Sequence, residues 1–446
     1  MLDTLRSWWQ DRLLRGVIRN SSYLFSSNTI SAGLSALQGI FVARLLGAGG
    51  YGLVSGTIIV FASNINRLLS FRMSEVVVKY LSQYLAENRR DRAGAFIKGI
   101  ALIEALTSVM AYLVLVLVAP VAARYLAKDE KTAPLFIFYG LALFATLIFE
   151  TSTGILQATN RFNRLALVNL IQSVVTASLI FLAFITRRGI MEVLAAYLIG
   201  KACAGLTIVV FAFRELNQSL GPGWWGSPLR LIPDWREPIL FAFNTNFNGT
   251  VNLFVRDSET LLIGLFRSQT EVGYYRLAQG VINMVMLPID PFIGPTYAEI
   301  TRTIAECQWA LTKRLLKRVS GISAIWTLSI GGILAIFGWW IIPFVYGSQF
   351  APAYPALVIL LMGYGFANIF QWNRPLLLAL GMPKYPLVVA ILVGLVKTGL
   401  TVGLTPILGY QGEAFALTSY FLASIGINVR RGIMEIDYKT IAEVKA

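Results

Sequence analysis

The sequence contains no histidine, only two cysteines and little charge. Without histidine, the chain lacks the commonest metal ligand, the side chain that titrates near neutral pH and every histidine-based catalytic triad. Cys203 and Cys307 lie far apart in the sequence. We therefore expect neither a disulfide framework nor a thiolate metal site. These absences exclude membrane enzymes whose chemistry depends on histidine.

Charged residues make up 14% of the 446 residues, whereas 56% are hydrophobic and the mean hydropathy is +0.65. A soluble domain carries roughly 25% charged residues, and a soluble chain of this length would need more polar surface. The apolar runs are about 20 residues long, which is enough for a helix to cross a bilayer. They are too long for the alternating strands of a barrel. The composition therefore predicts an all-α polytopic membrane protein.

The hydropathy pattern predicts twelve transmembrane helices. They lie near residues 22–43, 53–78, 97–118, 133–156, 166–185, 190–212, 239–263, 273–296, 320–342, 353–379, 386–407 and 411–429. One set of alternate loops carries 23 lysines and arginines and the other carries 7. Because the richer side is cytoplasmic, both termini are predicted to be cytoplasmic. The net charge of +15 then reflects topology rather than nucleic-acid binding.

The longest loop contains the glycines, prolines and paired tryptophans that break helices and suit a membrane interface. It divides the chain into two lobes of six helices each. The predicted parts are a cytoplasmic interfacial helix, an N-terminal lobe, the interlobe loop, a C-terminal lobe and a cytoplasmic tail. Their respective ranges are 1–21, 22–212, 213–237, 238–430 and 431–446.

The two halves show weak internal similarity. A span, a short cytoplasmic turn and a second span recur in both halves. Aligning Ala158 with Ala379 superposes these segments and places Glu150 opposite Gln371. An even number of spans per half implies parallel repeats with a cavity between the two lobes.

Cations within the predicted spans are costly in hydrocarbon unless they are paired or face a wet cavity. Several are expected to meet in a central cavity and to hold an anion such as phosphate or pyrophosphate. Arg67 and Arg72 have the alternative of snorkelling to the cytoplasmic surface. Arg256 has the alternative of a structural ion pair with nearby acids. The predicted cationic binding residues are Arg67, Arg72, Lys201, Arg256, Arg374 and Lys397.

Amide side chains form stripes at helical spacing, which favours either cavity lining or helix–helix hydrogen bonding. The predicted cavity-lining amides are Asn28, Gln38, Asn64, Asn248, Asn252, Gln279, Asn283 and Gln371. Three acids within spans are candidates for coupling or gating: Glu75, Glu150 and Asp290. Three prolines around Asp290 predict a kink or hinge in the eighth span. No metal site is predicted.

Four motifs lie at turns between the predicted helices. They read VARLLGAGGYGLVSG at 42–56, GILQATNRF at 154–162, EVGYYRLAQGV at 271–281 and FVYGSQFAPAYPALVILLMGYGFANIF at 344–370. In these motifs the chain resembles, over nearly its whole length, the Wzx-type flippases of bacterial polysaccharide biosynthesis. That family belongs to the MOP superfamily, with the MATE drug exporters and the MurJ lipid II flippases.

The resemblance implies a two-lobed, twelve-helix transporter that is not an enzyme. It implies movement of a polyprenyl-pyrophosphate-linked oligosaccharide across the cytoplasmic (inner) membrane by alternating access, for cell-surface polysaccharide synthesis. The expected partners are that lipid-linked substrate and membrane lipid, with polysaccharide polymerase and chain-length proteins as further candidates and no nucleic acid. No cofactor is expected, and the candidate coupling ions are the proton and sodium.

The rival interpretation is a MATE-like, cation-coupled exporter of small molecules. Many MATE exporters carry a cation-binding acid in the first span, and this chain has none between Ser21 and Val42. MurJ-like proteins usually carry two further spans, which the hydropathy pattern does not show. A glycan polymerase would need a longer outer loop than this chain has, and the number of charges within spans argues against a scaffold without transport activity.

Overall fold

The computed structural model describes residues 12–69, 73–232, 234–253 and 257–445, and the regular elements of these residues are helices. In the first half they are α2 (Arg12–Tyr51), η1 (Gly52–Ile58), α3 (Ile59–Leu69), α4 (Met73–Ala86), α5 (Arg90–Ala122), η2 (Ala123–Ala127), η3 (Glu130–Thr132), α6 (Ala133–Gly140), α7 (Ala142–Ala145), α8 (Phe149–Ala158), α9 (Phe162–Ile185) and α10 (Ile190–Leu220). Two short turns, η4 (Trp224–Gly226) and η5 (Leu229–Leu231), follow. The second half contains α11 (Arg236–Asn252), α12 (Glu259–Phe266), α13 (Gln269–Met286), α14 (Asp290–Ala305), α15 (Trp309–Tyr346), η7 (Ser348–Phe350), α16 (Ala353–Ile369), α17 (Asn373–Ala379), α18 (Lys384–Leu408) and α19 (Tyr410–Lys445).

Eight helices among the described residues are long and apolar enough to cross a membrane. The prediction of an all-helical, multi-span membrane protein is therefore confirmed, and the number twelve stays a prediction. The seventh predicted span is divided between α11 and α12, and the eighth between α13 and α14. The second of these interruptions, after Met286, confirms the break predicted from the prolines around Asp290.

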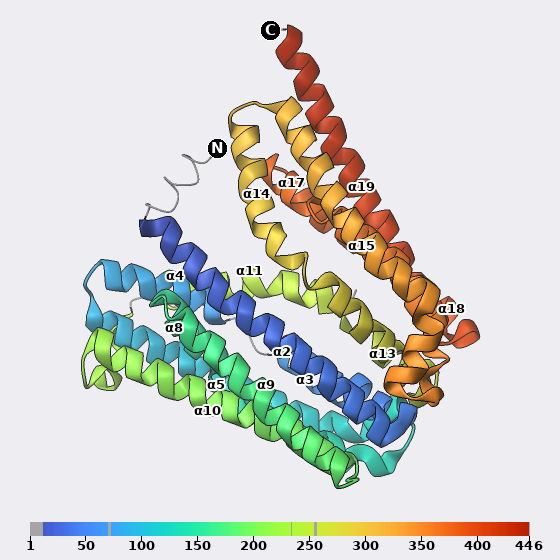
Figure 1. Ribbon diagram of the computed structural model, residues 1–446. Helices are drawn as coiled ribbons and strands as arrows, with labels where there is room; N and C mark the ends of the chain where they lie inside the picture. The colour runs from blue at the N-terminus through green and yellow to red at the C-terminus, as the bar shows by residue number, and fades with distance from the viewer. Residues whose placement is uncertain (1–11, 70–72, 233, 254–256, 446) are drawn as a thin grey trace. The chain divides into compact units, whose positions relative to one another are not determined.

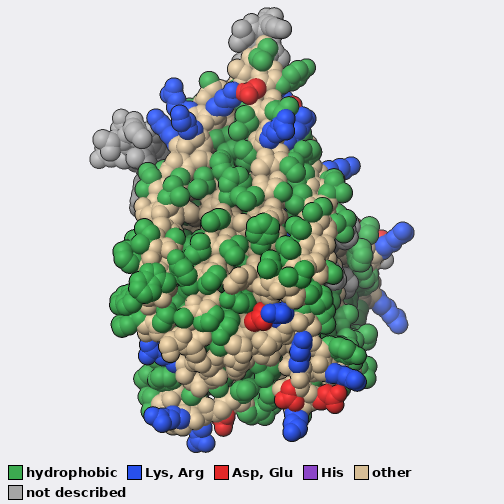
Figure 2. Space-filling model, turned by 90° about the vertical axis from the view of Figure 1, so that its right-hand side faces the viewer, with side chains coloured by type: hydrophobic (Ala, Val, Ile, Leu, Met, Phe, Trp, Pro, Cys, Tyr) green, Lys and Arg blue, Asp and Glu red, His purple; other side chains and the backbone are tan. Residues whose placement is uncertain are grey.

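Helices α15, α18 and α19 present a broad hydrophobic surface, with Lys and Arg gathered toward its ends (Figure 2). Exposed side chains on these helices include Ile325, Leu328, Phe337, Leu395 and Phe415. A surface of this kind would be unfavourable in water. It matches a lipid-facing surface in which the helices satisfy their own backbone hydrogen bonds.

The chain divides into two compact units. Unit 1 contains residues 1–45 and 58–253, and unit 2 contains residues 46–57 and 254–446. In unit 1, α10 packs along α9 and α8, and α4 packs on α8 (Figure 1). In unit 2, α19 packs along α18 and α16. The predicted lobe boundaries describe the membrane topology and stay predictions.

The chain passes between the units at places where the helical backbone is irregular. Gly47, next to the first passage, has φ 70° and ψ 179°, which interrupts α2. The π-helical η1 covers the second passage, and the third lies between α11 and α12. Helix irregularities of this kind are frequent at functional hinges. The segment 46–57, which carries one of the family-like motifs, therefore packs with the second half of the chain.

The structure describes the first two predicted spans in part. The backbone of Gly47 is non-helical, with φ 70° and ψ 179°, so two helices meet at a kink there, close to the predicted end of the first span. Helix α3 is described up to Leu69 and α4 from Met73, and residues 70–72 of the predicted second span lie outside the described residues. Glu75 lies in the first turn of α4, where a carboxylate interacts favourably with the helix dipole. Arg72 lies outside the described residues, so the predicted face shared by Arg72 and Glu75 stays a prediction.

The backbone supports a duplicated origin of the two halves. Residues with positive φ lie at matching helix ends of the two halves, 219 to 222 positions apart. Few residues other than glycine and asparagine adopt this backbone conformation readily. These pairs are Asn88 and Cys307, Lys128 and Gly347, Asn160 and Gly381, and Arg187 and Gly409.

The turn after the fourth predicted span has the same backbone hydrogen bonds as the matching turn in the second half. The amide of Asn160 donates to the carbonyl of Gln157, and the amide of Arg161 donates to that of Leu156. In the second half the amide of Gly381 donates to Leu378 and that of Met382 donates to Leu377. These are the hydrogen bonds of a left-handed helix C-cap. Their spacing agrees with the alignment of Ala158 with Ala379.

Candidate functional site

Unit 1 brings two of the predicted binding cations together. Arg67 lies in the last turn of α3, and Lys201 lies in the middle of α10. Lys201 is partly buried, Arg67 is exposed, and the positive charge of Arg67 acts on the Lys201 ammonium. Like charges repel each other, and a bound anion would relieve that repulsion.

Lys201 has no carboxylate within ion-pairing distance among the described residues. A lysine within a spanning helix is normally paired with an acid or directed into water. The arrangement of Lys201 beside Arg67 can therefore receive an oxyanion through charge-assisted hydrogen bonds.

The other predicted cations fall in different surroundings. Lys397 on α18 is fully buried and forms an ion pair with Glu413 on α19, inside unit 2. Arg374 on α17 is exposed. Arg72 and Arg256 lie outside the described residues. A role for Lys397 in substrate binding would require its contact with Glu413 to open, and all these roles stay predictions.

The predicted amides that the structure describes mostly form contacts within a unit. The Gln38 side chain donates a hydrogen bond to the carbonyl of Ser173, and the Asn169 side-chain amide donates one to Asn28 Oδ1 at 3.4 Å. Asn64 is buried, and Asn283 is exposed. These contacts are of the kind that joins helices in a membrane. The side chains of Asn248 and Asn252 are outside the described part of the structure.

Two further amides belong to buried polar groups of unit 2. Gln279 on α13 donates to Glu259 on α12, which also accepts a hydrogen bond from the Tyr275 hydroxyl at 2.7 Å. Gln371, between α16 and α17, donates to the Ser323 hydroxyl at 3.1 Å. Gln279 is partly buried and Gln371 is buried, with no hydrogen-bond partner for its Oε1 among the described residues. The assignment of both amides to a substrate cavity stays a prediction.

The three candidate acids are also separated by the fold. Glu150, near the start of α8, accepts a hydrogen bond from Ser74 on α4 at 2.6 Å. Glu75 is exposed on α4, and the Asp290 side chain is outside the described part. Among the described residues, no group of three His, Cys, Asp or Glu side chains is placed to hold a metal ion.

Sequence reasoning missed Glu104 and Glu413, two fully buried acids on predicted spans. Both stand in apolar stretches, and an ionisable residue within a membrane helix is a functional candidate by default. A search for isolated acids within apolar runs would have found both residues.

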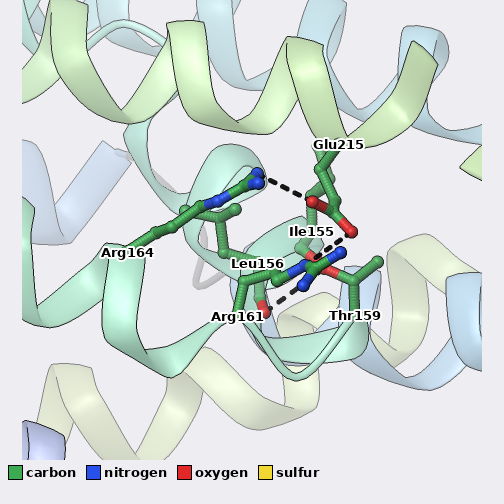
Figure 3. Close-up of polar contacts among 6 residues, drawn as sticks. All are labelled: Ile155, Leu156, Thr159, Arg161, Arg164 and Glu215. Atoms are coloured by element: carbon green, nitrogen blue, oxygen red, sulfur yellow. Dashed lines mark hydrogen bonds and ion pairs between the residues drawn. The ribbon is translucent and has the colours of Figure 1, made fainter. Parts of the chain in front are cut away.

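An ion cluster joins the turn of the GILQATNRF motif to α10. Arg161 and Arg164 both bind Glu215, at 2.9 and 2.7 Å, and Figure 3 shows the two guanidinium groups converging on this carboxylate. The Glu215 side chain is 4% exposed. The motif thus combines the left-handed cap at Asn160 with an electrostatic attachment to the neighbouring helix.

We expect Glu215→Ala to lower the free energy of unfolding by about 2 kcal/mol, because it removes two hydrogen bonds between charged groups. The matched control is Glu87→Ala, which removes an exposed ion pair with Arg89 and should change stability by less than about 1 kcal/mol. Thermal unfolding of the purified protein in detergent measures both. Equal midpoints for the two variants would show that the Glu215 cluster does not stabilise unit 1.

The fold and these motifs can be compared with known proteins. Residues 17–301 match the family described as polysaccharide biosynthesis protein. The chain belongs to this family. It is 22% identical over 364 residues to the inner membrane protein YghQ of Escherichia coli (strain K12), an alignment that spans 78% of this chain and 98% of YghQ.

Two solved transporters share the fold over almost all of the chain. An inward-facing multidrug resistance MATE transporter of the MOP superfamily has a TM-score of 0.70, with 14% identity over 92% of this chain and 95% of its own. The lipid II flippase MurJ, in an inward closed conformation, also has a TM-score of 0.70, with 17% identity over 94% and 91%. The protein is thus a multi-pass membrane protein of the polysaccharide biosynthesis family, with a MOP-type transporter fold rather than an enzyme fold.

Proposed function

We propose that the protein is a flippase that moves a polyprenyl-pyrophosphate-linked oligosaccharide across the cytoplasmic membrane by alternating access. Family membership supports a role in polysaccharide synthesis, and the likeness of the fold to MurJ supports a lipid-linked substrate. The observation that carries the proposal is the action of the Arg67 charge on Lys201, because two cations that act on each other suit a pyrophosphate. The proposal includes twelve spans, two lobes of six helices and cytoplasmic termini.

In this proposal the pyrophosphate binds at Lys201 and Arg67 of unit 1. Arg72, Arg256, Arg374 and Lys397 stay predicted binding cations, and the predicted amide stripes bind sugar hydroxyls. The polyprenyl chain stays in lipid, because its burial in a polar site would be unfavourable. The coupling ion is a proton or sodium.

The direct test uses purified protein in liposomes that carry a fluorescent polyprenyl-pyrophosphate oligosaccharide in both leaflets. An external quencher or glycosidase reports the accessible fraction. Accessibility of the inner-leaflet pool, beyond that in protein-free liposomes, would establish flipping. No increase with any tested glycan, with or without a proton or sodium gradient, would contradict the proposal.

We expect Lys201→Met to lower the flipping rate at least tenfold at unchanged abundance. The loss of one charge-assisted contact to an oxyanion corresponds to about 1.5–3 kcal/mol. The matched control is Lys384→Met, at the start of α18 and distant in sequence from the cation pair. An unchanged rate in Lys201→Met at equal abundance would remove Lys201 from the binding site.

A cation-coupled exporter of small molecules is the second candidate, because the MATE transporter fits the fold as well as MurJ does. Drug resistance on overexpression would favour the exporter. A dedicated flippase should leave resistance unchanged.

A further inference from the structure

The first turns of α15 in unit 2 carry an exposed cluster of cations. Lys313, Arg314, Lys317 and Arg318 lie within six residues of one another, and all four are exposed. Lys313 pairs with Asp437 of α19. The other three, called here the α15 cations, form no ion pair with any residue that the structure describes.

The described acids near the ends of α14 and α19 do not neutralise the α15 cations. Glu299 of α14 pairs with Arg302, and Glu435 of α19 pairs with Arg431. Glu306, just after α14, lies close enough to Arg302 to act on its charge. The α15 cations are therefore available to an anion from outside the described part of the chain.

The internal repeat identifies the equivalent face of unit 1. A spacing of 219 residues separates the left-handed residues that precede α5 and α15, so the starts of these two helices correspond. The matching positions are Ala95 and Arg314, Lys98 and Lys317, and Gly99 and Arg318. The two faces can thus be compared position by position.

In unit 1 this face is covered by the loop that follows α10. The Lys98 ammonium donates hydrogen bonds to the carbonyls of Trp225 and Ser227, at 3.2 and 3.3 Å. A Cβ atom placed at Gly99 would lie 2.1 Å from the ring of Trp235, so the loop needs a glycine beneath it. Lys98 therefore finds its oxygen acceptors within its own unit.

Unit 2 has the opposite arrangement at the matching positions. Arg318 stands where Gly99 makes room for the tryptophan ring, and a side chain of this size excludes such a cover. Lys317 carries the same ammonium as Lys98 but is exposed, without a hydrogen-bond acceptor among the described residues. Membrane topology favours positive charge near this end of α15, but it does not require the charges to share one face. This face therefore suits an external group that supplies oxygen acceptors.

The face of α15 that carries these cations continues into an apolar surface. Ile325 follows Arg318 at an interval of seven residues, so both lie on one side of the helix. Ile322, Ile325 and Leu328 are 58, 71 and 67% exposed, and they lie about 6 to 15 Å along the helix from Arg318. Figure 2 shows Lys and Arg gathered toward the ends of the hydrophobic surface. A ligand with an anionic head and apolar chains would match both parts of this face.

We propose that the α15 cations bind the phosphate of an anionic phospholipid, whose acyl chains lie against Ile322 and Ile325. Arg314 and Arg318 are one helical turn apart and donate charge-assisted hydrogen bonds to the phosphate oxygens. Lys317 supplies a third positive charge. Clusters of lysine and arginine beside a transmembrane helix attract anionic lipid in this way. The inference concerns the lipid around the protein and does not depend on the transported substrate.

The test compares two lipids whose headgroups differ in net charge. The purified protein is placed in nanodiscs of equal parts phosphatidylglycerol and phosphatidylethanolamine, and native mass spectrometry after detergent extraction counts the retained lipids. We expect the wild type to retain about tenfold more phosphatidylglycerol, because each cation contributes a preference of roughly fivefold. The ratio should fall to near unity in Arg314→Gln/Lys317→Gln/Arg318→Gln. Equal retention in the wild type, or a wild-type ratio in this triple variant, would overturn the proposal.

Two control variants separate a site from a general effect of charge. Lys131→Gln/Arg188→Gln/Lys384→Gln removes three exposed cations at other helix ends and should keep the wild-type ratio. Arg314→Lys/Arg318→Lys keeps the charge and should also keep the preference for phosphatidylglycerol. Because the replaced side chains are exposed, all variants should unfold at the wild-type temperature. An equal loss of the ratio in both triple variants would assign the preference to net charge and overturn the site.

A second measurement locates the lipid and identifies its source. Phosphatidylglycerol with a photoreactive acyl chain should label the segment that contains Ile322 and Ile325, and this labelling should be lost when the α15 cations are replaced. Excess inorganic phosphate should displace no more lipid than chloride does at the same ionic strength. Selective displacement by phosphate would assign the site to a soluble anion. A smaller oligomer of the triple variant would assign it to contact between copies of the chain, and either result would overturn the lipid proposal.

Discussion

Replacing Lys397 by alanine is expected to abolish accumulation of the folded protein. Lys397 and Glu413 are 1% and 0% exposed and form an ion pair between α18 and α19. Removing one partner leaves a charge buried in apolar surroundings, which costs about 3–5 kcal/mol. The stability of a whole protein is of the order of 5–15 kcal/mol. Most molecules of this variant should therefore misfold or be degraded.

The sequence alone suggested that Lys397 binds substrate, and its ion pair with Glu413 changes the expected effect of replacing it. A lysine that faced only a substrate would lower transport without lowering abundance. The paired lysine should lower abundance first, and Glu413→Ala should do the same. The double variant Lys397→Met/Glu413→Gln should recover abundance, because neither unpaired charge remains.

Membrane abundance and the thermal midpoint in detergent measure this recovery. If Lys397→Ala kept wild-type abundance, water would have to reach the pair, and the buried contact would be disproved. If the double variant recovered abundance but not flipping, the pair would be needed for transport as well as for stability. Transport at the wild-type rate in the recovered variant would remove Lys397 from the binding site.

The second large effect is expected at Gly52 and Gly273, both of which belong to unit 2. A Cβ atom placed at Gly52 would lie 1.9 Å from the carbonyl oxygen of Gln269, and one at Gly273 would lie 2.1 Å from that of Ala48. Each glycine therefore faces the carbonyl four residues before the other. Such reciprocal contacts bring two backbones closer than any side chain permits.

Alanine at either position should separate the two backbones, because neither carbonyl can move without breaking its helix. We expect a loss of about 3 kcal/mol, at the upper end of the cost of overpacking. The matched control is Gly280→Ala on the same helix α13, where nothing lies within 4 Å of the added atom. That control should keep or raise the stability, since alanine favours a helix.

Thermal unfolding of the three variants in detergent measures these differences. If Gly52→Ala and Gly273→Ala unfolded at the wild-type temperature, the close crossing would be absent from the membrane protein. The positions also explain two family-like motifs, because VARLLGAGGYGLVSG supplies Gly52 and EVGYYRLAQGV supplies Gly273. The glycine in each motif is required because it lets the backbones of the two segments approach each other closely.

The sequence predicted the membrane class, the helical fold and the family, because these depend on composition, run length and local turn signals. It also predicted the register of the internal repeat, which the left-handed residues Asn160 and Gly381 support. The break around Asp290 was predictable because proline removes a backbone donor within its own helix.

By itself, the sequence determined what each segment can be: an apolar helix, a turn, or a position for a buried ion. Only the tertiary structure decided which ions meet. It placed Arg67 beside Lys201, attached Lys397 to Glu413 and set Glu104 at the start of α8. Arg67 and Lys201 belong to helices that are distant in sequence, whereas Lys397 and Glu413 lie on consecutive helices, and helical periodicity fixes only the face on which a residue lies. The partner of a buried charge depends on which helices pack together, and that is decided by the packing of the whole unit.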